Sequence, residues 1–171
     1  MNRYSELRSK MATGDCILWS GSGIISGLIK WKTKSKISHA SLVVRLKKYE
    51  GLKDRVFLVE ALPSGLELRL LSERAHSYKG SVYLAHQALM TKGQRRICRA
   101  RALTKVAEDV KYDYGSLFRN VVGKVNVDAR RFFCSEFVWW IWNEAHYHEN
   151  IKNEAPVPGD LWNYGDMYQI K

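Results

Sequence analysis

The stretch of residues 130–142 constrains the fold most, because a helical apolar pattern begins there at a cysteine. Apolar side chains recur at helical spacing through Cys134, Phe137, Val138, Ile141 and Ala145. Ser135 and Glu136 follow the cysteine, and polar or acidic residues are typical of a helix start. The pattern predicts a helix with Cys134 in its first turn, on the face that packs inward.

Cys134 allows two interpretations. A thiol near the positive end of a helix is favoured as the thiolate, the form that acts as a nucleophile. A free cysteine also behaves as a small apolar side chain and is among the residue types most often buried. The residues elsewhere in the chain must decide between a nucleophile and a core residue.

The length of 171 residues fits one domain with a sizeable core, so we expect a single domain over residues 1–171. Hydrophobic residues make up 46% and charged residues 26%, which is typical of globular rather than disordered chains. The three cysteines lack metal-type spacing and are too few for a disulfide framework, which favours a reducing compartment. The polar first residues contain no signal-peptide core, and no apolar run is long enough to cross a bilayer. We therefore expect a cytoplasmic protein.

The net charge of +11 favours acidic partners, namely nucleic acid, anionic lipid head groups or an anionic substrate. Lysine and arginine are spread along the chain, without zinc-finger spacing or an RNA-binding aromatic signature, so we expect no specific nucleic-acid binding. Residues 24–31 are apolar on one side and are followed by lysines. This segment either lies on a membrane surface or packs on the protein's own core.

Two β-branched runs, residues 38–45 and 55–62, predict a hairpin of two strands. A turn centred near Tyr49 and Glu50 sets His39 directly opposite Glu60 in the register. Glu60 shares its strand with apolar residues, and a carboxylate there is costly unless it is paired, for which His39 is available. The alternative is an edge strand with Glu60 in water.

Residues 13–19, 65–70 and 81–85 have the patterns of further strands, and residues 92–110 have a helical pattern with a basic outer side. The tail around residues 156–162 is irregular and is expected to dock over the core. The fold class is therefore α+β, with a small antiparallel sheet packed against the Cys134 helix and the basic helix.

A cysteine at a helix start, a histidine on one strand and a carboxylate on the next are the parts of a Cys-His-Glu triad. The thiolate attacks a carbonyl carbon, the imidazole carries the proton, and the carboxylate orients the ring. These roles fall to Cys134, His39 and Glu60. Glu67 and Asp15 are the next candidates for the carboxylate.

The sequence resembles the NlpC-type papain-like cysteine peptidases in their circularly permuted, YiiX-like arrangement. The stretch 14–18 resembles the family's Gly-Asp-Leu strand, 38–43 its histidine strand, and 59–61 the strand with the third polar residue. The tyrosine turn and the cysteine helix, which come first in the unpermuted family, correspond to residues 112–116 and 132–138 at the end of this chain.

The resemblance implies a circularly permuted papain-like (NlpC-like) fold and thiol-dependent hydrolysis of an amide or peptide bond through an acyl-enzyme. It also implies that Tyr112, with Tyr114 second, lies near the oxyanion or the substrate. We expect no metal and no cofactor, and a peptide, amide or acyl-ester substrate. One alternative is a lipid-directed acyltransferase or thioesterase that uses the same triad at a membrane surface. The other is a non-catalytic basic binding module.

Overall fold

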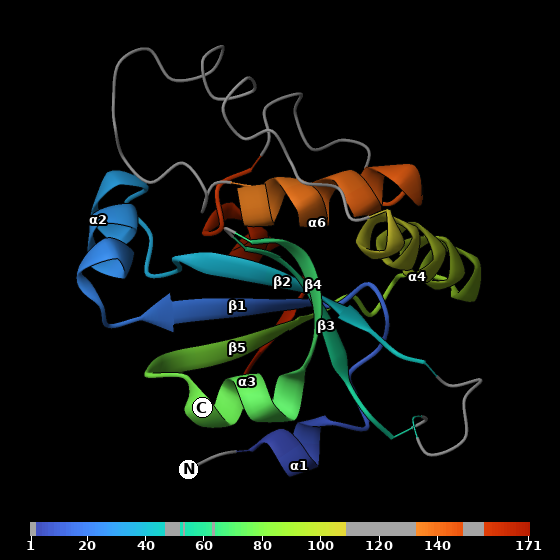
Figure 1. Ribbon diagram of the computed structural model, residues 1–171, viewed down its shortest axis with the longest axis horizontal. Coiled ribbons are helices and arrows are strands. Elements are labelled where there is room, and N and C mark those ends of the chain that lie inside the picture. The colour runs from blue at the N-terminus through green and yellow to red at the C-terminus, as the bar shows by residue number, and fades with distance from the viewer. Residues whose placement is uncertain (1–2, 47–51, 53, 63, 109–132, 149–155) are drawn as a thin grey trace.

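A six-stranded antiparallel sheet forms the centre of the molecule (Figure 1), in the strand order β4-β3-β2-β1-β5-β6. The computed structural model describes residues 3–46, 52, 54–62, 64–108, 133–148 and 156–171. The strands are β1 (Cys16–Gly21), β2 (His39–Val44), β3 (Phe57–Leu62), β4 (Gly65–Leu70), β5 (Gly80–His86) and β6 (Asp166–Gln169). The predicted α+β class with an antiparallel sheet is confirmed, and the sheet is larger than expected.

Helices cover both faces of this sheet (Figure 1). One face carries α4 (Lys92–Ala107) and α6 (Phe133–Glu144), and the other carries α1 (Tyr4–Leu7) and α3 (Leu71–Ser77). The helix α2 (Ile24–Lys32) lies in the connection between β1 and β2, and the 3-10 helix η2 (Asp160–Asn163) precedes β6. No helix in the described ranges is long and apolar enough to cross a membrane.

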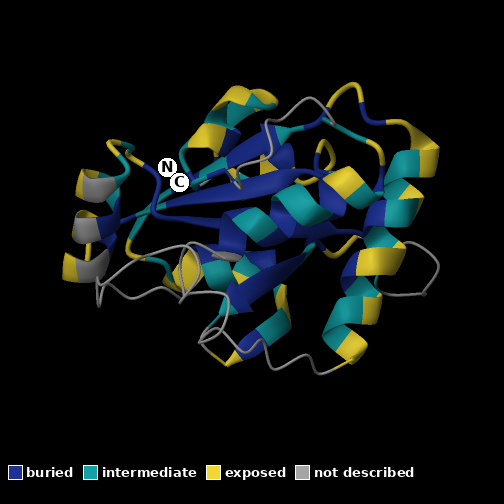
Figure 2. Ribbon diagram, turned by 90° about the horizontal axis from the view of Figure 1, so that it is seen from above, coloured by how far each residue is buried: buried dark blue, intermediate teal, exposed yellow. Residues whose placement is uncertain are grey.

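Both faces of the central strands are apolar, because successive side chains point to opposite sides of a strand. Leu18 and Leu42 belong to the core under α6, whereas Ile17 and Val43 belong to the core under α3. All four side chains are fully buried. The strands are accordingly dark blue in Figure 2, and the exposed residues lie mainly on the outer sides of the helices and at the turns.

The two predicted helices are both present. The predicted basic helix is α4, which begins after a capping box in which Thr91 and Gln94 satisfy each other's backbone amides. The predicted Cys134 helix is α6, which begins at Phe133 and so has Cys134 in its first turn, as expected. The tail docks over the core as expected, since Leu161 of η2 is fully buried there.

The register of the β2–β3 hairpin differs from the predicted one. The strands pair Leu42 with Val59 and Val43 with Leu58, so the same register sets Ser41, not His39, opposite Glu60. The predicted pairing was therefore wrong by two residues. Because side chains alternate with a period of two, such a shift leaves every side chain on its expected face. His39 is therefore the diagonal neighbour of Glu60, still within its reach.

The buried carboxylate of Asp15 lies just before β1, at the end of the sheet away from His39. It accepts hydrogen bonds from His86 Nδ1 at 2.8 Å, from Arg95 Nη1 at 3.1 Å and from the backbone amides of Ala12 and Gln87. Arg95 also donates to the carbonyl oxygen of Thr13, at 2.7 Å. This cluster joins the start of β1 to the end of β5 and to α4.

We expect Asp15→Asn to lower the free energy of unfolding by about 3–5 kcal/mol, because it leaves the Arg95 charge without its buried partner. Urea denaturation followed by circular dichroism measures the change. Glu108→Gln is the control, since its ion pair with Lys105 is exposed and contributes less than about 1 kcal/mol. An Asp15 variant as stable as the Glu108 variant contradicts the structural role of the cluster.

Candidate active site

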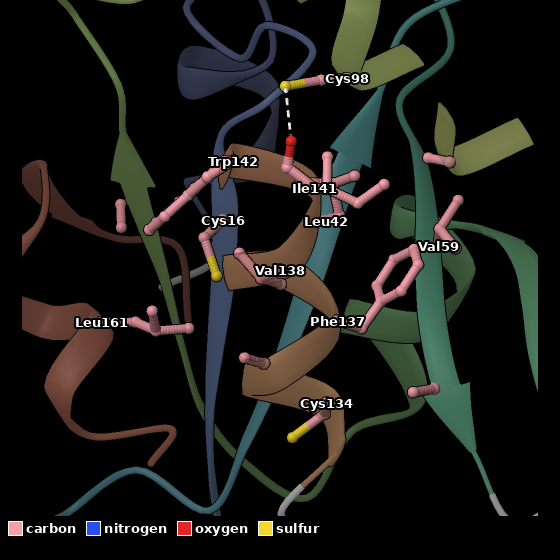
Figure 3. Close-up of a cluster of buried hydrophobic side chains, with 14 of the residues drawn as sticks. Cys16, Leu42, Val59, Cys98, Cys134, Phe137, Val138, Ile141, Trp142 and Leu161 are labelled. Atoms are coloured by element: carbon pink, nitrogen blue, oxygen red, sulfur yellow. Dashed lines mark hydrogen bonds between the residues drawn. The ribbon is translucent and has the colours of Figure 1, made fainter. Parts of the chain in front are cut away.

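Cys134 is the second residue of α6 and lies on the side of the helix that faces the sheet (Figure 3). The same buried side continues through Phe137, Val138 and Ile141. Their packing against the sheet fixes the orientation of the helix about its own axis. Cys134 is itself fully buried. The packing of α6 thus determines where the thiol lies, at the end of the helix that carries the positive partial charge.

His39 is the first residue of β2 and bridges two groups. Its Nε2 atom lies 3.0 Å from Oε1 of Glu60, and its ring hydrogen-bonds the Cys134 side chain. Because Nε2 faces Glu60, Nδ1 is the ring nitrogen that remains for the thiol. Within the described residues, β2 and β3 pair only from Leu42 to Val44. His39 therefore lies where the two strands are no longer paired, and its ring reaches Cys134 on the α6 side.

The Glu60 carboxylate is fully buried, and both of its oxygens accept hydrogen bonds. Its Oε1 atom accepts from Ser41 Oγ at 2.8 Å in addition to its contact with His39. Its Oε2 atom accepts from Arg74 Nε of α3 at 3.3 Å. A buried carboxylate is tolerated only where such donors replace water, and here they come from two other elements.

Trp19 of β1 supports both flanking donors of Glu60. Its indole Nε1 donates to Ser41 Oγ at 2.6 Å, and the Arg74 guanidinium lies 5.1 Å from the centre of its ring. Trp19 is fully buried, so its ring leaves Ser41 and Arg74 little freedom. The Glu60 carboxylate is therefore fixed by a second layer of contacts.

The electrostatics favour a charged histidine. Burial lowers the pKa of His39, but the Cys134 charge and hydrogen bond, together with Glu60, outweigh it and raise this pKa to about 9. Burial raises the pKa of Glu60, and the contacts with His39, Arg74 and Ser41 outweigh it, so this pKa lies below its ordinary value. At neutral pH the site therefore holds an imidazolium between Glu60 and the sulfur of Cys134.

The other two cysteines have different surroundings. Burial, with smaller contributions from Cys134 and Asp15, raises the pKa of Cys16 well above its ordinary value. Burial also raises the pKa of Cys98 to about 12. Both thiols are packed in the core, as expected, and the Cys98 sulfur contacts the carbonyl oxygen of Ile141 (Figure 3). Neither is a ready nucleophile at neutral pH.

The remaining candidates from the sequence do not meet His39. Glu67 is paired with Glu60 across β3 and β4, but its carboxylate contacts Arg69 at 2.9 Å and Ser64. Asp15 lies at the other end of the sheet, in the cluster with His86 and Arg95. Tyr112 and Tyr114 lie outside the described residues.

The roles of Ser41 and Arg74 were not predicted from the sequence. Ser41 was detectable, because it lies two residues after His39 and so shares its strand face. Arg74 had no comparable signal. It lies on α3, a helix of 7 residues that is too short to show a clear apolar period.

We expect Arg74→Met to lower the free energy of unfolding at neutral pH by about 1–2 kcal/mol, an intermediate value for a partly buried ion pair. Arg74 favours the ionised form of Glu60, so the loss is full above the ordinary Glu pKa of 4.5. It shrinks as the pH falls through the lowered native pKa, where Glu60 takes up a proton. Urea denaturation across this pH range measures it.

Arg69→Met is the matched control, because Arg69 pairs with the partly exposed Glu67. It should change the free energy of unfolding by less than about 1 kcal/mol. An Arg74 variant whose loss of stability is the same at every pH argues against an electrostatic contribution to Glu60.

No known protein family and no curated protein matches the sequence. Among solved structures, the chain is similar to the crystal structure of metalloprotein YiiX from Escherichia coli O157:H7, with a TM-score of 0.65 and 16% sequence identity. The match covers 95% of this chain and 97% of that chain. At such low identity the similarity concerns the fold and does not transfer an activity.

YiiX is named a metalloprotein, but the described part of this chain contains no group of three or more His, Cys, Asp or Glu residues that could hold a metal ion. The described residues do not fit such a centre. The YiiX-like part of the expected resemblance is confirmed, and its relation to NlpC-type peptidases remains a prediction. The chain has a YiiX-like α+β fold.

Proposed function

We propose that this protein is a permuted papain-like thiol hydrolase that cleaves an amide bond, or a related acyl bond, through an acyl-enzyme. The observation that carries the proposal is the position of His39, in contact with the buried Glu60 carboxylate and with the Cys134 side chain. Nothing in the packing of an antiparallel sheet requires an imidazolium at this point. Burying it costs free energy, which is typical of a group kept for chemistry.

In the proposed reaction the Cys134 sulfur attacks the carbonyl carbon of the substrate. The bond to the leaving group breaks as His39 gives its proton to that group, and a thioester to Cys134 remains. Water then attacks the thioester carbon while neutral His39 takes a proton from it. The carboxylic acid product forms as the bond to sulfur breaks, which releases Cys134 as the thiolate beside the imidazolium. Each step conserves charge and needs no oxidant or metal.

Glu60 acts as the orienting group in this proposal. Its Oε1 atom holds Nε2 of His39, which directs Nδ1 toward Cys134, and its charge favours the imidazolium. Ser41 and Arg74 keep the carboxylate in place. For the oxyanion, the positive end of the α6 dipole lies at Cys134, and Tyr112 or Tyr114 remains the proposed side-chain contact.

We expect iodoacetamide at neutral pH to alkylate Cys134 much faster than Cys16 or Cys98. All three thiols are buried, so exposure does not distinguish them, whereas only Cys134 among the described residues has an imidazolium partner. Mass spectrometry of peptides after brief labelling measures the three rates. His39→Ala should slow the reaction at Cys134 without changing the other two. Equal labelling of all three cysteines contradicts an activated nucleophile.

We expect Glu60→Gln to reduce the turnover of an acyl anilide by about 10²-fold, because the amide presents the ring with a weaker and differently arranged partner. In the wild type the rate should fall as the pH rises through about 9, where His39 loses the proton that the leaving group needs. Since Glu60 raises the pKa of His39, this decrease should begin at lower pH in the variant. Stopped assays across the alkaline range measure both effects.

A nitrophenyl ester of the same acyl group is the control substrate, since its leaving group departs without protonation. The alkaline decrease should be absent with this ester. Cys134→Ala should be inactive toward both substrates, with its circular dichroism spectrum unchanged. A Glu60 variant with wild-type rates and an unshifted alkaline decrease assigns the orienting role to another group.

A further inference from the structure

The helix α2 exposes large apolar side chains on one side. Ile24 is 87% exposed and Trp31 is 80% exposed, whereas Ile29 is buried. Ile24 and Trp31 are seven residues apart, with Gly27 between them, so the three residues lie on one face of the helix. Gly27 has open space where a side chain would project. Burial is the usual state of such side chains, and this exposed face is therefore informative.

Lysines flank this face at both ends. Lys34 follows the helix and is exposed, and Lys79 lies beside its start, where its carbonyl oxygen accepts from Ser22 Oγ at 3.1 Å. Lys30, near the end of the helix, donates from Nζ to the carbonyl oxygen of Gly21 at 2.8 Å. The net charge of the whole chain, +11, has the same sign. The partner of this surface should therefore be both apolar and anionic.

We propose that the exposed face of α2, defined by Ile24, Gly27 and Trp31, docks on the surface of an anionic lipid bilayer. Tryptophan is enriched at the boundary between head groups and acyl chains, because its ring is apolar and its indole N–H is polar. Lysines beside such a face add attraction to anionic head groups. A helix of 9 residues that exposes Ile24 and Trp31 inserts shallowly, so its binding depends on both the apolar and the electrostatic contribution.

The position of α2 relates this surface to the candidate active site. The helix connects the end of β1 to the start of β2, which is His39, and Trp19 pairs with His39 across the two strands. In Figure 1, α2 lies at the end of the sheet where β1 ends and β2 begins. A bilayer docked on α2 would therefore lie beside the end of the molecule that holds His39. The proposal goes beyond the proposed function and does not depend on it.

Cosedimentation with vesicles tests the proposal. The wild type should bind vesicles of phosphatidylcholine with phosphatidylglycerol, and it should bind pure phosphatidylcholine vesicles much more weakly. The double variant Ile24→Ser, Trp31→Ser should bind the anionic vesicles at least about tenfold more weakly. Because both side chains are exposed, its thermal unfolding should match the wild type.

Matched control variants exist at the opposite end of the sheet. Leu89 is also 87% exposed, so Leu89→Ser removes an equally exposed apolar side chain and should leave binding unchanged. Lys34→Glu should weaken binding to anionic vesicles, whereas Lys92→Glu, with the same change of net charge at an exposed position, should weaken it less.

Three results overturn the proposal. The first is equal loss of binding in the Leu89 and α2 variants, and the second is absence of binding to anionic vesicles at physiological salt. The third is self-association of the wild type in sedimentation velocity that the α2 variants abolish, which would make the face a contact between two copies. Cys134→Ala should bind vesicles as the wild type does, so loss of the proposed activity leaves this test unaffected.

Discussion

The buried carboxylate of Glu60 joins three segments that are distant in the sequence. It lies on β3, accepts hydrogen bonds from His39 and Ser41 of β2, and accepts one from Arg74 of α3. A carboxylate removed from water is costly unless donors of this kind surround it. The position of His39, and with it the contact to Cys134, therefore depends on the correct packing of β2, β3 and α3 together.

Asp15 shows that a buried carboxylate alone does not make a site. It is as fully buried as Glu60 and also contacts one histidine and one arginine, namely His86 and Arg95. Its other donors are the backbone amides of Ala12 and Gln87, so the cluster satisfies its own charges within the fold. What distinguishes Glu60 is the further contact from its histidine to a thiol at a helix start.

Sequence patterns predicted the elements that are long or that repeat apolar residues at a regular spacing. The helix α6, with Cys134 in its first turn, was predictable from its apolar spacing, and β2 and β3 were predictable from their β-branched residues. The register was not, because the polar residues between these strands do not define how many of them form the turn. The error was two residues, and the alternation of side chains kept His39 and Glu60 on one face. The contact between His39 and Glu60 was thus predictable from the alternation of side chains along the strands, without the correct pairing of residues.

The missed parts of the structure share a different cause. Arg74 belongs to a short helix, and β6 is an edge strand of 4 residues whose pattern is polar and irregular. Such elements are stabilised by their neighbours rather than by their own sequence. Just after β6, for example, the backbone N–H of Ile170 donates to the carbonyl oxygen of Val82, and the N–H of Val82 donates to the carbonyl oxygen of Lys171. The hydrogen bond from Arg74 of α3 to Glu60 can therefore be identified only from the three-dimensional structure.

The tryptophans show why the surface of α2 needs an explanation. Trp19 and Trp142 are fully buried, and each uses its indole N–H in a hydrogen bond, to Ser41 and to the carbonyl oxygen of Gly14. Burial of Trp31 would stabilise the fold about as much as burial of Trp19 or Trp142 does. Trp31 instead projects into solvent, from a helix whose other side is packed. Folding of this chain gains little from Trp31 in that position. The proposed lipid surface, an apolar layer beneath anionic head groups, would give Trp31 the apolar contact that this position in the fold does not provide.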